Sequence, residues 1–181
     1  MASKRHERTR ARRSALQVLY TGEICNESPT QLAESGQVLD EVDELSDYAM
    51  MLIRGCESHQ VTIDKHLTTT SENWSLSRMP IIDRSILRLA VFEMMFVDDV
   101  PVSVAINEAV ELAKDFGAED ESPRFVNGIL GRISQSLAEE VGKEAPTAEE
   151  LAQADELATE DLAVKADPAD ANLSTGVCDG E

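Results

Sequence analysis

Apolar residues recur every three or four positions along most of the chain, and this period constrains the fold more than any other feature. The interval matches the turn of an α-helix and differs from the two-residue alternation of a β-strand. Runs of alternating β-branched residues are missing, and only 4% of the residues are aromatic. The 181 residues have room for one domain of ordinary size and an appendage. We therefore predict an all-α fold with about six or seven helices.

Prolines, glycines and short polar runs separate the predicted helices. Ser28 fits an N-cap and Pro29 the first position of a short helix that ends near Gly36. Three further signals are Gly55 as a weak point in a helix, Gly117 as a left-handed helix end, and Ser122 as an N-cap before the last helix. The apolar stripes predict a first helix that begins inside residues 1–13, a long helix from about residue 40, and helices over 80–96, 101–116 and 122–137.

Charge divides the chain into three parts. The net charge of −19 is made up of +5 over residues 1–13, −13 over 14–137 and −11 over 138–181. The basic part carries six of the sixteen Lys and Arg residues, namely Lys4, Arg5, Arg8, Arg10, Arg12 and Arg13. We predict a basic arm that runs into the first helix, a helical domain over 14–137, and a disordered acidic tail over 138–181, which holds too few large apolar groups to offset its ordering entropy.

Several functional classes fit the sequence poorly. No window approaches the roughly 20 apolar residues that span a bilayer, and no apolar segment follows the basic start as in a secretory signal, so we expect a cytoplasmic protein without a membrane partner. Cys25, Cys56 and Cys178 are odd in number and widely spaced, which predicts reduced thiols. We expect no metal site, no cofactor and no catalytic residue, because no nucleophile and base pair at a suitable spacing.

The basic arm favours a polyanionic ligand. A local positive field, rather than net charge, decides binding to nucleic acid. Guanidinium groups form paired hydrogen bonds with phosphate oxygens and also stack on exposed RNA bases. The alternative is a solvated arm that only aids solubility, since short basic termini are common.

Two later segments have structural interpretations. Arg84 and Arg88 are four residues apart, which predicts a salt-bridged helix with both on one exposed edge. Asn107 and Asn127 lie inside apolar stretches, so we expect buried amides that tie elements together, while Gly128 suggests the close approach of another backbone.

The same segments carry a family resemblance. The sequences Asp-Arg-Ser-Ile-Leu-Arg at 83–88, Ala-Ile-Asn-Glu-Ala-Val-Glu-Leu-Ala-Lys at 105–114 and Phe-Val-Asn-Gly-Ile-Leu at 125–130 together resemble the NusB family of bacterial antitermination factors. The resemblance covers roughly residues 5–137 and leaves the acidic tail outside. It implies two small helical bundles packed together, and a function in binding boxA-type single-stranded RNA of nascent ribosomal RNA.

The resemblance also implies partners and site residues. The partners are boxA RNA, the small-subunit ribosomal protein that serves as NusE, and the antitermination complex with RNA polymerase. The implied RNA-binding residues are Arg8, Arg10, Arg12, Arg13, Tyr20, Arg124 and Phe125. The residues implied on the NusE side are Asp83 and Glu93.

Two other functional classes compete with this interpretation. A helical protein-interaction module without RNA activity, as a monomer or a homodimer, would use the basic arm to bind an acidic partner or its own acidic tail. An enzyme is the third class, because NusB-like domains also occur fused to ribosomal RNA methyltransferases. We expect no enzyme, since no glycine-rich strand, loop and helix for a methyl donor is found in the sequence.

Overall fold

A computed structural model of the chain describes residues 2–36, 45–70 and 75–144. Within these ranges the chain forms seven α-helices, one 3-10 helix and no strand, which confirms the all-α prediction. The elements are α1 (Ala2–Cys25), α2 (Pro29–Ser35), α3 (Asp47–Ser58), α4 (Gln60–Thr70), the 3-10 helix η1 (Leu76–Arg78), α5 (Ile81–Phe96), α6 (Val102–Phe116) and α7 (Ser122–Glu144).

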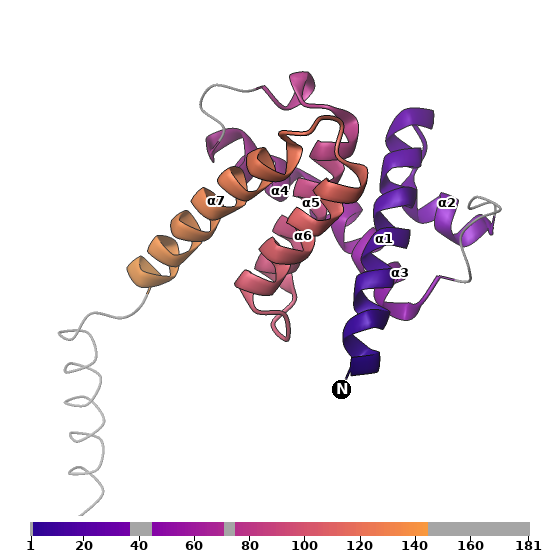
Figure 1. The fold of residues 1–181 in the computed structure, drawn as a ribbon, viewed down its shortest axis with the longest axis horizontal. Helices are drawn as coiled ribbons and strands as arrows, with labels where there is room; N and C mark the ends of the chain where they lie inside the picture. The colour runs from indigo at the N-terminus through magenta and orange to yellow at the C-terminus, as the bar shows by residue number, and fades with distance from the viewer. Residues whose placement is uncertain (1, 37–44, 71–74, 145–181) are drawn as a thin grey trace, which may run out of the picture. The chain divides into compact units, whose positions relative to one another are not determined.

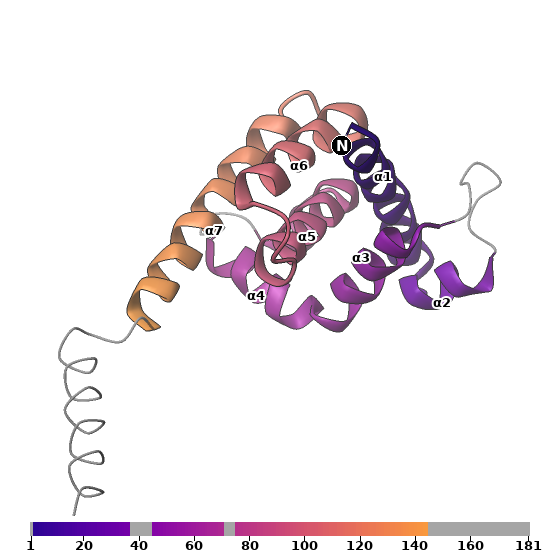
Figure 2. The ribbon, with the colours of Figure 1, turned by 90° about the horizontal axis from the view of Figure 1, so that it is seen from below.

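Helix α5 lies at the centre of the fold. It packs against α1, α3, α4 and α6, and Figure 2 shows it enclosed by these helices and α7. Its composition suits this place, because it is apolar on nearly every face and nine of its residues are buried.

Two groups of helices share one hydrophobic core. Helices α1, α2 and α3 pack on one another, while α4, α6 and the start of α7 gather with α5 (Figure 1). Contacts of α1 and α3 with α5 join the groups, and one cluster of buried residues runs from Leu16 in α1 through Leu89 in α5 to Ile133 in α7. The predicted arrangement of two packed bundles is confirmed.

Local capping signals explain where the early helices begin and end. The Ser28 side chain accepts a hydrogen bond from the Gln31 backbone N–H at 3.2 Å, Pro29 opens α2, and Gly36 ends it with φ of 67°. All three positions were predicted. Helix α3 begins after a second cap, Ser46, which accepts from the Ala49 N–H at 3.3 Å; the predicted start near residue 40 lies outside the described residues.

Close packing surrounds two of the glycines singled out in the sequence. Gly55 lies inside α3, where an added Cβ would stand 2.0 Å from the Phe92 ring, so packing explains why a helix-weakening residue is found there. The prediction that Gly117 is left-handed was wrong, since its φ is −55°. A Cβ there would lie 2.4 Å from the carbonyl oxygen of Ala113 and 2.5 Å from Cβ of Ser122, so this turn requires a residue without a side chain.

Two predictions in the closing helices were also wrong. Asn107 and Asn127 are exposed rather than buried, because each lies on the outer side of an amphipathic helix. A Cβ added at Gly128 would meet no neighbouring group within 4 Å among the described residues, so no other backbone approaches it there. Helix α7 ends at Glu144, a few residues beyond its predicted end near Leu137. The remainder of the segment predicted to be disordered, 145–181, lies outside the described residues.

Gly55 and Gly128 form a matched pair for a stability test. Gly55→Ala should lower the free energy of unfolding, because the strain of overpacking, about 1–3 kcal/mol, exceeds the gain in helix propensity of about 1 kcal/mol. Gly128→Ala should raise the free energy of unfolding by about 0.5–1 kcal/mol, because only the propensity gain applies there. Urea unfolding followed by helical circular dichroism measures both, and equal shifts in the two variants would contradict this packing.

Candidate nucleic-acid interface

The arginines of α1 lie on two different faces of the helix. Intervals of four, three and four residues separate Arg8, Arg12, Ala15 and Leu19. All four therefore lie on the face of α1 that packs against the rest of the protein. Arg10, Arg13 and Tyr20 follow the same period on the other side, and all three are exposed. The helix therefore divides its basic residues into an inner and an outer set.

Arg12 belongs to the inner set and is buried in an ion-pair network. Its Nε donates to both carboxylate oxygens of Glu93, each at 2.9 Å, and its Nη1 lies 3.1 Å from Glu108 Oε2. The side chains of Arg12 and Glu93 are 3% and 1% exposed. Burial disfavours the charged guanidinium, but the hydrogen bond and charge of Glu93 outweigh it and raise the pKa of Arg12. Arg12 therefore joins α1 to α5 and α6 and has no surface to offer RNA.

Tyr48 of α3 completes the network. Its hydroxyl donates to Glu93 Oε1, and its ring lies beneath the guanidinium groups of Arg8 and Arg12, at 4.7 and 5.8 Å from the ring centre. Burial, together with the hydrogen bond to Glu93, raises the pKa of the Tyr48 phenol. The network thus connects four helices, α1, α3, α5 and α6.

Arg8 and Arg13 form ion pairs nearer the surface. Arg8 pairs with Asp99 in the loop between α5 and α6, and Arg13 pairs with Asp115 near the end of α6. The Arg13 guanidinium also lies 5.6 Å from the centre of the Phe116 ring. These pairs place the basic half of α1 alongside α6 (Figure 1).

The outer face of α1 is the strongest candidate site for RNA. Arg10 and Arg13 offer guanidinium groups there, and Tyr20 has an exposed ring, with 38% of the residue accessible. Phe116, which was not predicted from the sequence, is 44% exposed beside Arg13. The signal available in the sequence was the position of Phe116, a large aromatic residue at the predicted end of a helix. Cations next to exposed rings suit single-stranded nucleic acid, which offers phosphates and unstacked bases.

The start of α7 contributes the other predicted RNA residues. Arg124 is exposed and Phe125 half-buried in the first turn of this helix. The loop before them is held by Asp83 of α5, whose carboxylate accepts from the Ser122 hydroxyl at 2.8 Å and from the Ala118 N–H at 3.2 Å. The Ser122 hydroxyl in turn accepts from the Glu119 N–H at 3.1 Å. This loop follows directly on the end of α6, where Phe116 and Arg13 meet.

The two residues predicted on the partner side are both buried. Asp83 is 3% exposed and holds the loop before α7, and Glu93 is 1% exposed and holds Arg12. Neither carboxylate faces outward. Arg84 and Arg88 do not form the predicted exposed edge either: Arg84 pairs with Glu23, and Arg88 pairs with Glu23 and with Asp64 at 2.7 Å, all four side chains being at most 25% exposed.

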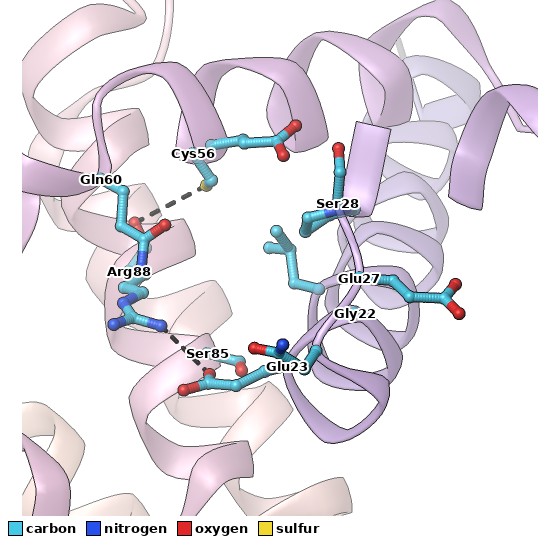
Figure 3. A pocket seen from close by; sticks show the side chains of 12 residues that line it. Gly22, Glu23, Glu27, Ser28, Cys56, Gln60, Ser85 and Arg88 are labelled. Atoms are coloured by element: carbon cyan, nitrogen blue, oxygen red, sulfur yellow. Dashed lines mark hydrogen bonds and ion pairs between the residues drawn. The ribbon is translucent and has the colours of Figure 1, made fainter. Parts of the chain in front are cut away.

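A second site on the protein is a pocket of about 370 Å³ between α1, α3 and α5, shown in Figure 3. Glu23, Glu27 and Glu57 line it against one guanidinium, that of Arg88. Its local charge is therefore unsuited to phosphate. The Cys56 thiol faces the Arg88 carbonyl oxygen at 3.8 Å, and burial raises its pKa, so it is a poor nucleophile.

The described part of the chain offers neither a metal site nor a membrane span. Within residues 2–36, 45–70 and 75–144, no three His, Cys, Asp or Glu side chains are grouped to hold a metal ion. Over those same ranges, no helix is both long and apolar enough to cross a bilayer.

The buried ion pair gives a stability prediction. Arg12→Met should lower the free energy of unfolding by about 3–5 kcal/mol, because Glu93 would remain charged and buried without its cation. Adding Glu93→Gln should recover at least half of that loss, since a neutral amide oxygen can still accept from Tyr48 and needs no counter-charge. Urea unfolding of both variants tests this, and a double variant no more stable than Arg12→Met would count against the network.

Comparison with known proteins agrees with this architecture. Residues 9–135 match the NusB family. The chain is 42% identical over 126 residues to the transcription antitermination protein NusB of Nocardioides sp., covering 70% of this chain and 92% of that protein. It is 43% identical over 129 residues to the NusB protein of Arthrobacter sp., covering 71% and 93%.

Solved structures show the same fold. A structure of T. maritima NusB superposes with a TM-score of 0.63 at 37% identity, over 71% of this chain and 90% of that chain. A crystal structure of NusB and NusE in complex with double-stranded RNA superposes with a TM-score of 0.60 at 27% identity, over 72% of this chain and 98% of that chain. The part matched to the family contains the basic half of α1 from residue 9, the central helix α5 and the start of α7. The chain belongs to the NusB family.

Proposed function

We propose that this chain is an RNA-binding transcription antitermination factor that binds boxA-type RNA of nascent ribosomal transcripts together with the ribosomal protein NusE. The outer face of α1 carries the proposal, because it brings Arg10, Arg13 and Tyr20 together in solvent. The related structure with NusE and double-stranded RNA supports the same choice of partners. Such an adaptor acts by binding and needs no chemistry, and it would work in the cytoplasm, where bacterial transcripts are made.

The proposed RNA site extends from α1 to the start of α7. Arg10 and Arg13 would contact phosphates, with Arg124 as a further cation at the other end. Tyr20, Phe116 and Phe125 would offer ring surfaces to bases. Arg8, only partly exposed, would lie at the edge of the site.

Three predicted residues are proposed as positioning residues rather than contacts. Arg12 and Glu93 fix how α1 is rotated on the protein. Asp83 fixes the loop that leads to Arg124. The loop residues Glu119, Asp120 and Glu121 are exposed beside this anchor, and we propose the surface around them for the protein partner.

RNA binding to the outer face can be tested with a pair of arginine variants. Arg10→Gln/Arg13→Gln should weaken binding of a boxA-type RNA oligonucleotide roughly tenfold at low salt, and lower the salt slope by about 0.7 for each phosphate that is no longer neutralised. Fluorescence anisotropy over a salt series measures both quantities, and a duplex of the same sequence shows whether the site requires single-stranded RNA.

The control for this experiment is Arg54→Gln. Arg54 is also exposed, at 58%, and pairs with Glu34, but it lies on α3 outside the proposed site. It should change affinity little. If Arg54→Gln weakened RNA binding as much as removing one of the two α1 arginines, net charge would explain binding and the assignment of the face would be wrong.

A further inference from the structure

Two arginines of α1 that would meet RNA are already paired with carboxylates of the same protein. Arg13 pairs with Asp115 and Arg8 with Asp99. We propose that Asp115 and Asp99 compete with RNA phosphate for these guanidinium groups and so set how tightly the protein binds RNA. This inference rests on the proposed function and states how RNA affinity is regulated at the same site.

The exposure of the two pairs makes the competition possible. The side chains of Arg13 and Asp115 are 49% and 42% exposed, and Asp99 is 59% exposed next to the 21% exposed Arg8. Phosphate oxygens can reach the same N–H groups from solvent. The carboxylates of the Arg12 network are enclosed, with Glu93 at 1% and Glu108 at 11%, so RNA cannot displace them. The buried pair of Arg12 with Glu93 is permanent, whereas the exposed pairs of Arg13 and Arg8 are exchangeable.

A carboxylate occupies the position that a phosphate oxygen would take. Both are anions that accept hydrogen bonds from a guanidinium, so each arginine can satisfy one of them at a time along a given N–H edge. Asp99 is ionised at neutral pH like any exposed aspartate, and the hydrogen bond and charge of Arg8 lower its pKa further. Exposed ion pairs contribute little to stability, so the protein folds without them and RNA can break them.

Asp115 also affects the neighbouring ring. Arg13 lies over Phe116, the residue that follows Asp115 at the end of α6. While Asp115 holds Arg13, the guanidinium stays beside the ring. Release of Arg13 would free both its N–H edge and the exposed ring for RNA. The competition therefore acts on a cation and on a stacking surface together.

The test compares acidic residues on α6 and in the loop before it. Asp115→Asn should raise affinity for the boxA-type oligonucleotide about two- to fivefold, and Asp99→Asn should act in the same direction. Glu111→Gln is the matched control, because it removes one acid from the same helix but one that pairs with Lys114. It should give a smaller increase, due only to the change in net charge.

A double-variant cycle separates competition from general charge. In an Arg13→Gln background, Asp115→Asn should raise RNA affinity by no more than Glu111→Gln does. The reason is that the arginine released by Asp115→Asn is absent from this background. If Asp115→Asn and Glu111→Gln raised RNA affinity equally when each was made alone, the inference would be overturned, while the proposal of RNA binding would stand. Failure of the unaltered chain to bind the oligonucleotide at all would instead overturn the proposed function. Thermal unfolding of each variant confirms that the fold is retained.

Discussion

The buried ion pair between Arg12 and Glu93 is the interaction on which the rest of the structure depends. A guanidinium and a carboxylate withdrawn from water are costly unless each is fully hydrogen-bonded. Here the Glu93 carboxylate accepts hydrogen bonds from Arg12 and Tyr48, and Arg12 also donates one to Glu108. One set of polar contacts therefore fixes α1, α3, α5 and α6 against each other within an otherwise apolar core.

The pair also decides which side of α1 faces outward. A helix held at Arg12 on one side must present the residues on its other side, Arg10 and Arg13, to solvent. Tyr20 lies on that same side two turns later. The folding interaction and the proposed RNA face are consequences of one helical period, so arginines that look alike in the sequence have different roles. Of these outer residues, Arg13 is paired with Asp115, an exposed carboxylate that we propose RNA replaces.

The sequence predicted much of this fold because its signals are local. Apolar spacing indicated the helices, and Ser28, Pro29 and Gly36 marked the bounds of α2. The environments of Gly55 and Gly117 depend on Phe92 and Ser122, which are distant or across a turn, so spacing could not reveal them. Exposure of Asn107 and Asn127 shows that an amide among apolar neighbours can still lie on the outer side of its helix.

For the site, the sequence identified the basic segment but not its division. Arg8 and Arg12 lie at helical spacing from the apolar residues Ala15 and Leu19, so the sequence period already indicated the inner set of arginines. The three-dimensional partners Glu93 and Glu108 are far along the chain, and no local pattern shows that they would enclose a cation. The same holds for Asp83, whose buried carboxylate anchors the loop before α7.

Native-state hydrogen exchange on an Arg12→Lys variant tests the central claim most directly. Lysine keeps the charge but lacks the Nε–H that donates to both oxygens of Glu93. If this contact holds α1 in place, the amides of α1 around and after residue 12 should exchange faster than in the unaltered protein, while those in the core part of α7 should keep their protection. Protection of α1 equal to that of the unaltered protein would contradict the account.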